Sequence, residues 1–170
     1  RSALYAILKA LNLPARSATA VAGGPQGSRI LLQAFTCNAV PNPVLWADFE
    51  PIYVDCADDF NINLEDLKSK AKPGDVLILQ HTFGLPANIE EINSIMRQMG
   101  VIVIEDCAHA LGAEVNGNKL GTMGKAGFFS FSRDKVISSV YGGMAVTNDD
   151  EIGRRLGELQ KEFGMPGYIW

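Results

Sequence analysis

Short apolar runs alternate with amphipathic segments from residue 50 to residue 147, and this alternation limits the fold more than any other feature of the chain. The apolar runs predict strands, and the segments between them, with apolar residues at helical spacing, predict helices. Strands are expected at 51–55 (PIYVD), 75–80 (DVLILQ) and 101–105 (VIVIE), and helices at 64–72 and 88–100. Strands joined by helices run parallel and are buried on both faces, which agrees with their continuous apolar character. The sequence therefore predicts an α/β fold with three layers, a mainly parallel sheet with helices on both faces.

The segments that flank this pattern predict further elements of the same fold. Ser2 is expected to be the N-cap of the first helix and Asn88 that of the helix at 88–100. Pro41 and Pro43 either break a helix or open it. The other expected elements are a helix at 2–12, a loop or weak strand at 14–28, a strand at 29–33, a hairpin at 114–121, strands at 126–132 and 142–147, and a helix at 149–163. Since neither an internal repeat nor a domain boundary is visible, residues 1–170 are expected to form one domain.

Charge and composition argue against several classes of partner. A net charge of −4 and a pI near 5.1 argue against nucleic acid, which is bound by basic surfaces. The apolar runs are shorter than the ~18 residues of a membrane span, so we expect no membrane partner. Three widely spaced cysteines indicate reduced thiols in a cytoplasmic protein. Because the chain starts without Met, we expect a fragment of a longer protein.

Polar side chains follow three of the predicted strands. Asp55, His81 and Asp106 lie at or just after strand ends, where open α/β sheets bind their ligands. Asp106 could pair with a cationic group of a ligand, or it could cap a loop. His109, three positions later, could face a ligand or be a buried histidine with its hydrogen bonds satisfied. The two histidines and three cysteines are too scattered to predict a metal site.

Lys135 follows one apolar strand and precedes another apolar segment. Desolvation between buried strands would make its amine nucleophilic and suited to a Schiff base, whereas in an edge loop its head would lie in water. Of Ser130 and Ser132, we expect only one to lie on the side of a ligand shared with Lys135. Gly142 and Gly143 permit either a close backbone approach or a turn.

Taken together, these residues resemble the DegT/DnrJ/EryC1/StrS family of pyridoxal-phosphate (PLP) aminotransferases, which act on nucleotide-linked keto sugars. The resemblance covers nearly the whole chain and implies the large domain of a fold-type I PLP enzyme, similar to that of aspartate aminotransferase. It is carried by S-A-L at the first helix, F-T-x5-N (Phe35, Thr36, Asn42), PIYVD…FNIN, QHTFGLPANIEEI, VIEDCAHALGAEVNGNKLGTMGKAGFFSF, and Lys135 followed by GGMAVTND.

The resemblance implies a role for each candidate residue. Lys135 corresponds to the catalytic lysine that binds the cofactor aldehyde, and its presence favours amino transfer over dehydration, because dehydrating relatives carry His there. Asp106 corresponds to the partner of the pyridine nitrogen, and His109 to the side chain against the ring. The phosphate contacts correspond to Ser130 and to the helix start at Ser2 and Ala3.

Two positions depart from the family pattern. Cys37 stands where an aromatic side chain commonly stacks on the cofactor, and Tyr141 stands where an acid usually precedes the Gly-Gly pair.

The resemblance also implies a homodimer with a further C-terminal domain, and glutamate as the amino donor. The alternatives are a fold-type I PLP enzyme with an amino-acid substrate and a non-catalytic α/β folding or dimerising module.

Overall fold

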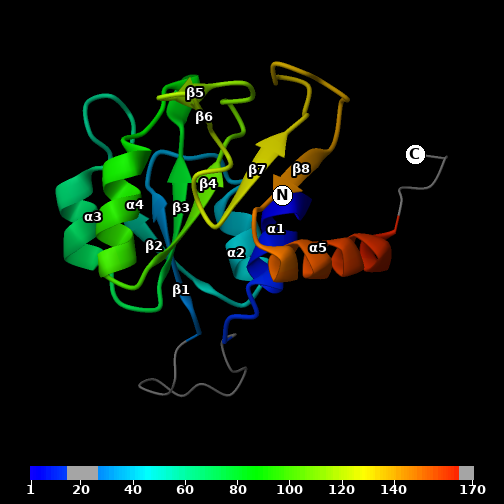
Figure 1. Cartoon of the computed structure of the whole chain (residues 1–170), viewed down its shortest axis with the longest axis horizontal. Coiled ribbons are helices and arrows are strands. Elements are labelled where there is room, and N and C mark those ends of the chain that lie inside the picture. Colours follow the sequence, from blue (N-terminus) through cyan, green and yellow to red (C-terminus); the bar gives the residue numbers. More distant parts are fainter. Residues whose placement is uncertain (15–26, 165–170) are drawn as a thin grey trace.

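The computed structural model describes residues 1–14 and 27–164, which form a sheet with helices on both faces (Figure 1). The helices are α1 (Ser2–Ala10), α2 (Pro41–Trp46), α3 (Leu64–Lys70), α4 (Ile89–Gln98) and α5 (Asp150–Phe163), with a 3₁₀ turn, η1 (Thr82–Gly84). The strands are β1 (Arg29–Gln33), β2 (Glu50–Val54), β3 (Val76–Gln80), β4 (Ile102–Asp106), β5 (Glu114–Val115), β6 (Asn118–Lys119), β7 (Ala126–Ser130) and β8 (Gly143–Val146).

The main sheet has six strands in the order β2-β1-β3-β4-β7-β8. Its neighbours pair in parallel up to β7, and β8 pairs antiparallel with β7. Figure 1 shows α3 and α4 on one face and α1, α2 and α5 on the other. The predicted α/β class with a mainly parallel sheet between helices is therefore confirmed.

Two hydrophobic clusters fill the spaces between the layers. Successive residues of a strand point to opposite faces, so Leu31 and Leu77 pack toward α3 and α4, while Leu32 and Ile78 pack toward α1 and α2. Fully burying such a side chain contributes about 1.5–3 kcal/mol. Burial on both faces explains why these strands lack the polar alternation of a half-exposed sheet.

Several predicted boundaries need correction at the helix ends. Ser2 is not an N-cap: α1 begins at Ser2 itself, Arg1 is the N-cap, and its side chain makes no capping bond to the described residues. Asn88 is the N-cap residue of α4, but its amide donates to the side chain of Glu91. Helix α3 ends at Lys70, short of the expected Lys72, because Ala71 already has an extended backbone.

Other local predictions are confirmed, and one falls mostly outside the structure. Pro41 opens α2 from its first turn, where a missing N–H costs nothing. The hairpin forms through Asn116 and Gly117, both at positive φ, as a tight turn requires. The loop or weak strand expected at 14–28 lies largely outside the described residues. None of the helices in the described parts combines the length and apolar character that a membrane crossing needs.

Candidate cofactor site

Asp106 ends the central strand β4 and lies 3% exposed at its carboxyl end. One carboxylate oxygen, Oδ1, accepts the Ala108 N–H at 2.9 Å. Burial raises the pKa of Asp106 to about 6, although the Ala108 N–H and the charge of Lys135 act in the opposite direction. A cationic N–H group bound here would offset the cost of burying this carboxylate. The side chain caps its own loop and is also suited to bind a ligand cation.

Lys135 lies in the loop between β7 and β8, and its side chain is 12% exposed. Its ammonium Nζ lies 3.1 Å from Oδ2 of Asp134. The hydrogen bonds from Ser132 and Lys135 lower the pKa of Asp134 to about 2, so this neighbour is ionised at neutral pH. The side chain of Lys135 is thus largely buried, unlike an edge-loop lysine, and it interacts electrostatically with Asp106.

Ser130 and Ser132 lie on the same side of the chain. The Ser130 hydroxyl donates to the Ser132 hydroxyl at 3.3 Å, and the Ser132 hydroxyl donates to Asp134 at 2.7 Å. The expectation that only one of them lies on the side of Lys135 is wrong, because side chains two positions apart along a strand share a face. The structure thus joins both hydroxyls to the Asp134–Lys135 pair.

His109 follows β4 and is itself exposed, so the alternative of a buried histidine is wrong. Its ring stacks on Phe83, with centroids 6.2 Å apart and planes 15° apart. Shielding from water lowers the pKa of His109, and the positive charge of Lys135 lowers it further. At neutral pH the ring is therefore an uncharged flat surface within the electrostatic reach of Lys135.

The start of α1 lies beside the same residues. Ala3 Cβ, in the first turn of α1, lies 3.7 Å from the point where a Cβ on Gly143 would lie. That Cβ would also come within 2.6 Å of the Phe129 carbonyl oxygen. The lack of a side chain at Gly143 therefore lets its backbone lie close to that of Phe129. The N–H groups of a first helical turn lack intrahelical partners and can bind an anion.

Not every predicted polar residue reaches this site. Asp55 follows the edge strand β2, three positions from β4 in the sheet order, and its carboxylate accepts the Cys56 N–H. The ring of His81 turns into the core and contacts Glu105. Tyr141 lies in the same loop as Lys135 and accepts a hydrogen bond from Arg133 at 3.2 Å. Of the three predicted residues Asp55, His81 and Asp106, the structure thus places Asp106 in the cluster with Lys135.

Glu105 is a buried ionisable residue that the sequence did not single out as a candidate. Its carboxylate lies close to His81 and Cys107, with potential ligand atoms all within 4.8 Å of one another. However, its two oxygens accept four N–H groups, and both ring nitrogens of His81 are hydrogen-bonded. Burial also raises the pKa of the Cys107 thiol, which disfavours the thiolate that a metal needs. The grouping therefore acts as a hydrogen-bond network.

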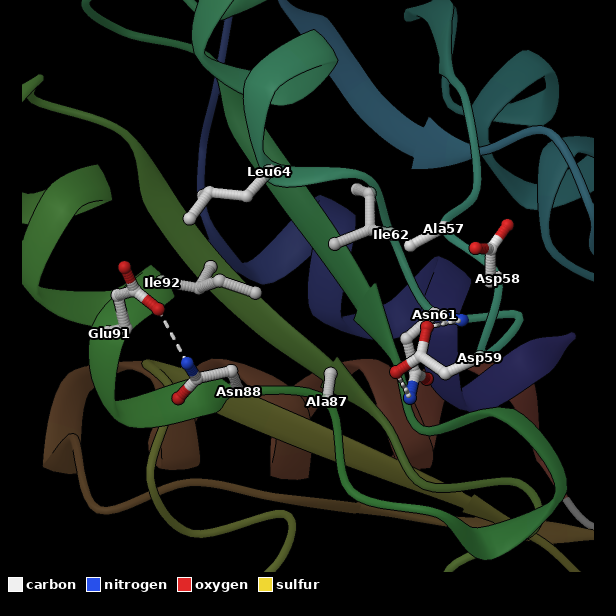
Figure 2. A pocket seen from close by; sticks show the side chains of 10 residues that line it. All are labelled: Ala57, Asp58, Asp59, Asn61, Ile62, Leu64, Ala87, Asn88, Glu91 and Ile92. Atoms are coloured by element: carbon white, nitrogen blue, oxygen red, sulfur yellow. Dashed lines mark hydrogen bonds between the residues drawn. The ribbon is translucent and has the colours of Figure 1, made fainter.

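A separate cavity of about 450 Å³ lies between the loop before α3 and the start of α4 (Figure 2). None of the predicted site residues lines it. Its polar groups bond to one another: Asn61 donates to Asp59 at 3.2 Å, and Asn88 donates to Glu91. We therefore place the candidate site at the Asp106–Lys135 cluster.

Comparison with the sequences of known proteins identifies one family. The DegT/DnrJ/EryC1/StrS aminotransferase family matches residues 3–167. A UDP-N-acetyl-3-dehydro-α-D-glucosamine 3-aminotransferase from Acidithiobacillus ferrooxidans is 36% identical over 148 residues, which cover 85% of this chain and 40% of that protein. A GDP-perosamine synthase from Vibrio cholerae is 33% identical over 132 residues, covering 76% and 36%. The chain thus spans about two fifths of the length of these relatives.

Solved structures agree over nearly the whole chain. An aminotransferase from Psychrobacter cryohalolentis matches with a TM-score of 0.82 and 26% identity, covering 99% of this chain and 43% of that protein. The GDP-4-keto-6-deoxy-D-mannose-3-dehydratase of E. coli, solved with bound hydrated PLP, matches with a TM-score of 0.75 and 26% identity, covering 89% and 38%. The predicted likeness to fold-type I PLP enzymes is confirmed at the level of the fold.

Proposed function

The chain belongs to the DegT/DnrJ/EryC1/StrS aminotransferase family, and from this premise we propose that it is the cofactor-binding large domain of an enzyme that transfers an amino group to a nucleotide-linked keto sugar. The names of the two relatives support a sugar substrate. We further propose a small C-terminal domain outside residues 1–170; the two-fifths coverage of these relatives supports a longer protein.

One observation carries the proposal: a buried carboxylate and a largely buried amine interact electrostatically at the carboxyl edge of a parallel sheet. Asp106 is 3% exposed and the Lys135 side chain 12%. Burying two ionisable groups costs free energy unless they are paired, so such groups at a sheet edge mark a candidate functional site. Lys135 is paired with Asp134, whereas Asp106 keeps a raised pKa, which a cationic ligand group would relieve.

Pyridoxal phosphate is the cofactor of this family, and the cluster fits its groups. When bound, it supplies an electron sink next to an aldehyde. Asp106 would accept the ring N–H and keep that nitrogen protonated. Lys135 would bind the aldehyde carbon through Nζ and, once released, move a proton on the substrate. His109 would lie against the ring as an uncharged imidazole.

The phosphate would be held at the opposite end of the same cluster. The Ser130 hydroxyl and the first-turn N–H groups of Ser2 and Ala3 supply donors for an anion. The thiol of Cys37 is exposed, and it would border the ring without supplying an aromatic face. We therefore expect weaker ring stacking than an aromatic residue at this position would give.

Three further parts of the proposal concern the whole protein. We propose glutamate as the amino donor, a cytoplasmic location and a homodimer. The dimer is supported by exposed apolar side chains near the site, because contiguous exposed apolar patches mark interfaces. Phe35, Phe60 and Phe83 are all about half exposed or more and contact one another, with ring centroids 5.6 to 6.1 Å apart.

The assignment of Lys135 can be tested by trapping the cofactor. Full-length protein is incubated with PLP, reduced with borohydride and digested, and mass spectrometry locates the pyridoxyl group. We expect it on Lys135, with loss of the adduct in Lys135→Ala. Lys125→Ala is the matched control, because Lys125 is exposed and paired with Asp149 at 2.6 Å. An adduct that persists at the same level in Lys135→Ala would contradict the assignment.

The substrate class needs a separate experiment. Amino transfer from glutamate is measured with a panel of nucleotide-linked keto sugars and a panel of keto acids. We expect turnover with a keto sugar only. Turnover confined to keto acids would instead support the fold-type I enzyme with an amino-acid substrate.

A further inference from the structure

The ring of His81 is fully buried directly after β3 and is bonded at both nitrogens. Its Nδ1 accepts the backbone N–H of Ala87 at 3.2 Å, and its Nε2 lies 3.3 Å from Oε2 of Glu105. Its own backbone N–H donates to the carbonyl of Asp106 at 3.1 Å. One residue therefore links the end of β3, the end of β4 and the loop that leads to α4.

These contacts define the tautomer of the ring. Because Nδ1 accepts an N–H, it carries no proton, so the ring proton lies on Nε2 and points to Glu105. Burial acts to raise the pKa of Glu105, but hydrogen bonds from His81, Gly121 and Gly124 outweigh it and hold the pKa below its ordinary value. A neutral imidazole thus donates to a carboxylate anion that backbone N–H groups already satisfy.

The loop held by His81 supports His109. Phe83 has a φ of 56°, a strained left-handed conformation for a residue with a side chain, and its ring stacks on His109. Gly84 is in the same region at φ 83°, and a Cβ there would come within 2.9 Å of the His109 carbonyl. The loop therefore contacts His109 through a ring and through the backbone, and its far end is bonded to the His81 ring at Ala87.

We propose that His81 is a positioning residue, whose neutral imidazole holds the loop of residues 82–87 at Ala87 and thereby keeps Phe83 against His109. The inference rests on the proposed function, which gives His109 and Asp106 their place beside the cofactor. The strain at Phe83 supports a functional purpose, because such a conformation persists only when its surroundings enforce it. His81 itself is fully buried, so its ring has no surface open to a substrate or cofactor.

Two substitutions separate the two ring contacts. In His81→Asn, the side-chain oxygen takes the place of Nδ1 and keeps an acceptor for Ala87. In His81→Gln, the amide nitrogen takes the place of Nε2 and keeps a donor for Glu105, while Ala87 loses its acceptor. Both variants lose one hydrogen bond in the core, so both are expected to be less stable, but only His81→Gln releases the loop.

The readout is the titration of His109, followed by NMR in the full-length protein without cofactor. We expect His81→Gln to raise the pKa of His109 toward its ordinary value, because the released loop no longer shields the ring. His81→Asn is expected to leave the pKa of His109 as it is in the unsubstituted protein. Equal titration of His109 in all three proteins would overturn the proposal, since a purely structural role of His81 would change stability alone.

A second readout is the affinity for PLP, measured by fluorescence titration. We expect a loss of about threefold to tenfold in His81→Gln, the worth of one hydrogen bond, and a smaller loss in His81→Asn. An order of affinities opposite to this would also overturn the proposal. Failure of the unsubstituted protein to bind PLP would refute the proposed function, while the titration of His109 would still decide the role of His81.

Discussion

Replacing Glu105 by Gln tests whether the buried carboxylate organises the core behind the site. Glu105 is fully buried in β4. Its Oε1 accepts the N–H groups of Met123 and Gly124 at 2.7 and 2.6 Å, and its Oε2 accepts that of Gly121 at 2.7 Å. The ring of His81 supplies the fourth donor, at 3.3 Å. The segment before β7 is thus bonded to β4 through one side chain.

The cost of the substitution follows from this geometry. Gln keeps one oxygen, so two donors would face an NH₂ group instead of an acceptor. Leaving a buried donor unsatisfied costs about 1–3 kcal/mol, so the free energy of unfolding should fall by about 2–6 kcal/mol. His81 cannot relieve the conflict by moving its proton to Nδ1, because Nδ1 accepts the Ala87 N–H.

Denaturant unfolding as a function of pH is the assay. Because the pKa of Glu105 is held below its ordinary value of about 4.5, its contribution to stability is present above that pH and is lost as the pH falls through the folded-state pKa. The difference between the two proteins should therefore narrow below pH 4.5. Glu114→Gln is the control, since Glu114 is exposed and bonded only to Lys119 among the described residues, and it should leave stability nearly unchanged. A loss below about 1 kcal/mol in Glu105→Gln at neutral pH would refute the reasoning.

Three further substitutions test the cost of a buried charge and of close backbone packing. The folded-state pKa of Asp106 lies near 6, above its ordinary 3.8, so burying its charge costs stability that returns as the pH falls from 6 to 4. Asp106→Asn should therefore raise the melting temperature of the cofactor-free protein at pH 7, remove this pH dependence and abolish tight PLP binding; an unchanged melting temperature would contradict the burial cost. Gly127→Ala should destabilise the fold in denaturant unfolding, because its Cβ would lie 2.5 Å from the Gly121 carbonyl, whereas Gly157→Ala in α5, with open space around it, should stabilise by about 1 kcal/mol. Equal effects of the two glycine substitutions would show that the close approach at Gly127 is easily relieved.

Most of the layered architecture could be predicted because it depends on local pattern. Continuous apolar runs such as 75–80 and 101–105 can be buried only between two layers of helices, and the structure has them as β3 and β4. The helix ends were less predictable. Ser2 resembles an N-cap by residue type, but whether it precedes the helix or begins it depends on the backbone of Arg1. Capping preferences describe which residues are suitable, and neighbouring dihedral angles decide which one is used.

The candidate site could be predicted in its parts, but its contacts could not. Asp106 was found by its place at a strand end and Lys135 by its place between two apolar segments, and the structure brings them within electrostatic reach. His81, also at a strand end, was expected on the same rim, yet its ring enters the core. Strand position determines where a residue's backbone lies, whereas the rotation of its side chain depends on partners that are distant in sequence.

The sequence by itself determined the fold class, the family and the order of acid, serine and lysine along the chain, because apolar periodicity and short motifs are local properties. Only the tertiary structure decided that Glu105 collects four N–H donors and that the loop after β3 stacks Phe83 on His109. These contacts join residues from separate strands and loops, and their energies depend on distance and burial. Such quantities exist only once the sheet has brought the segments together.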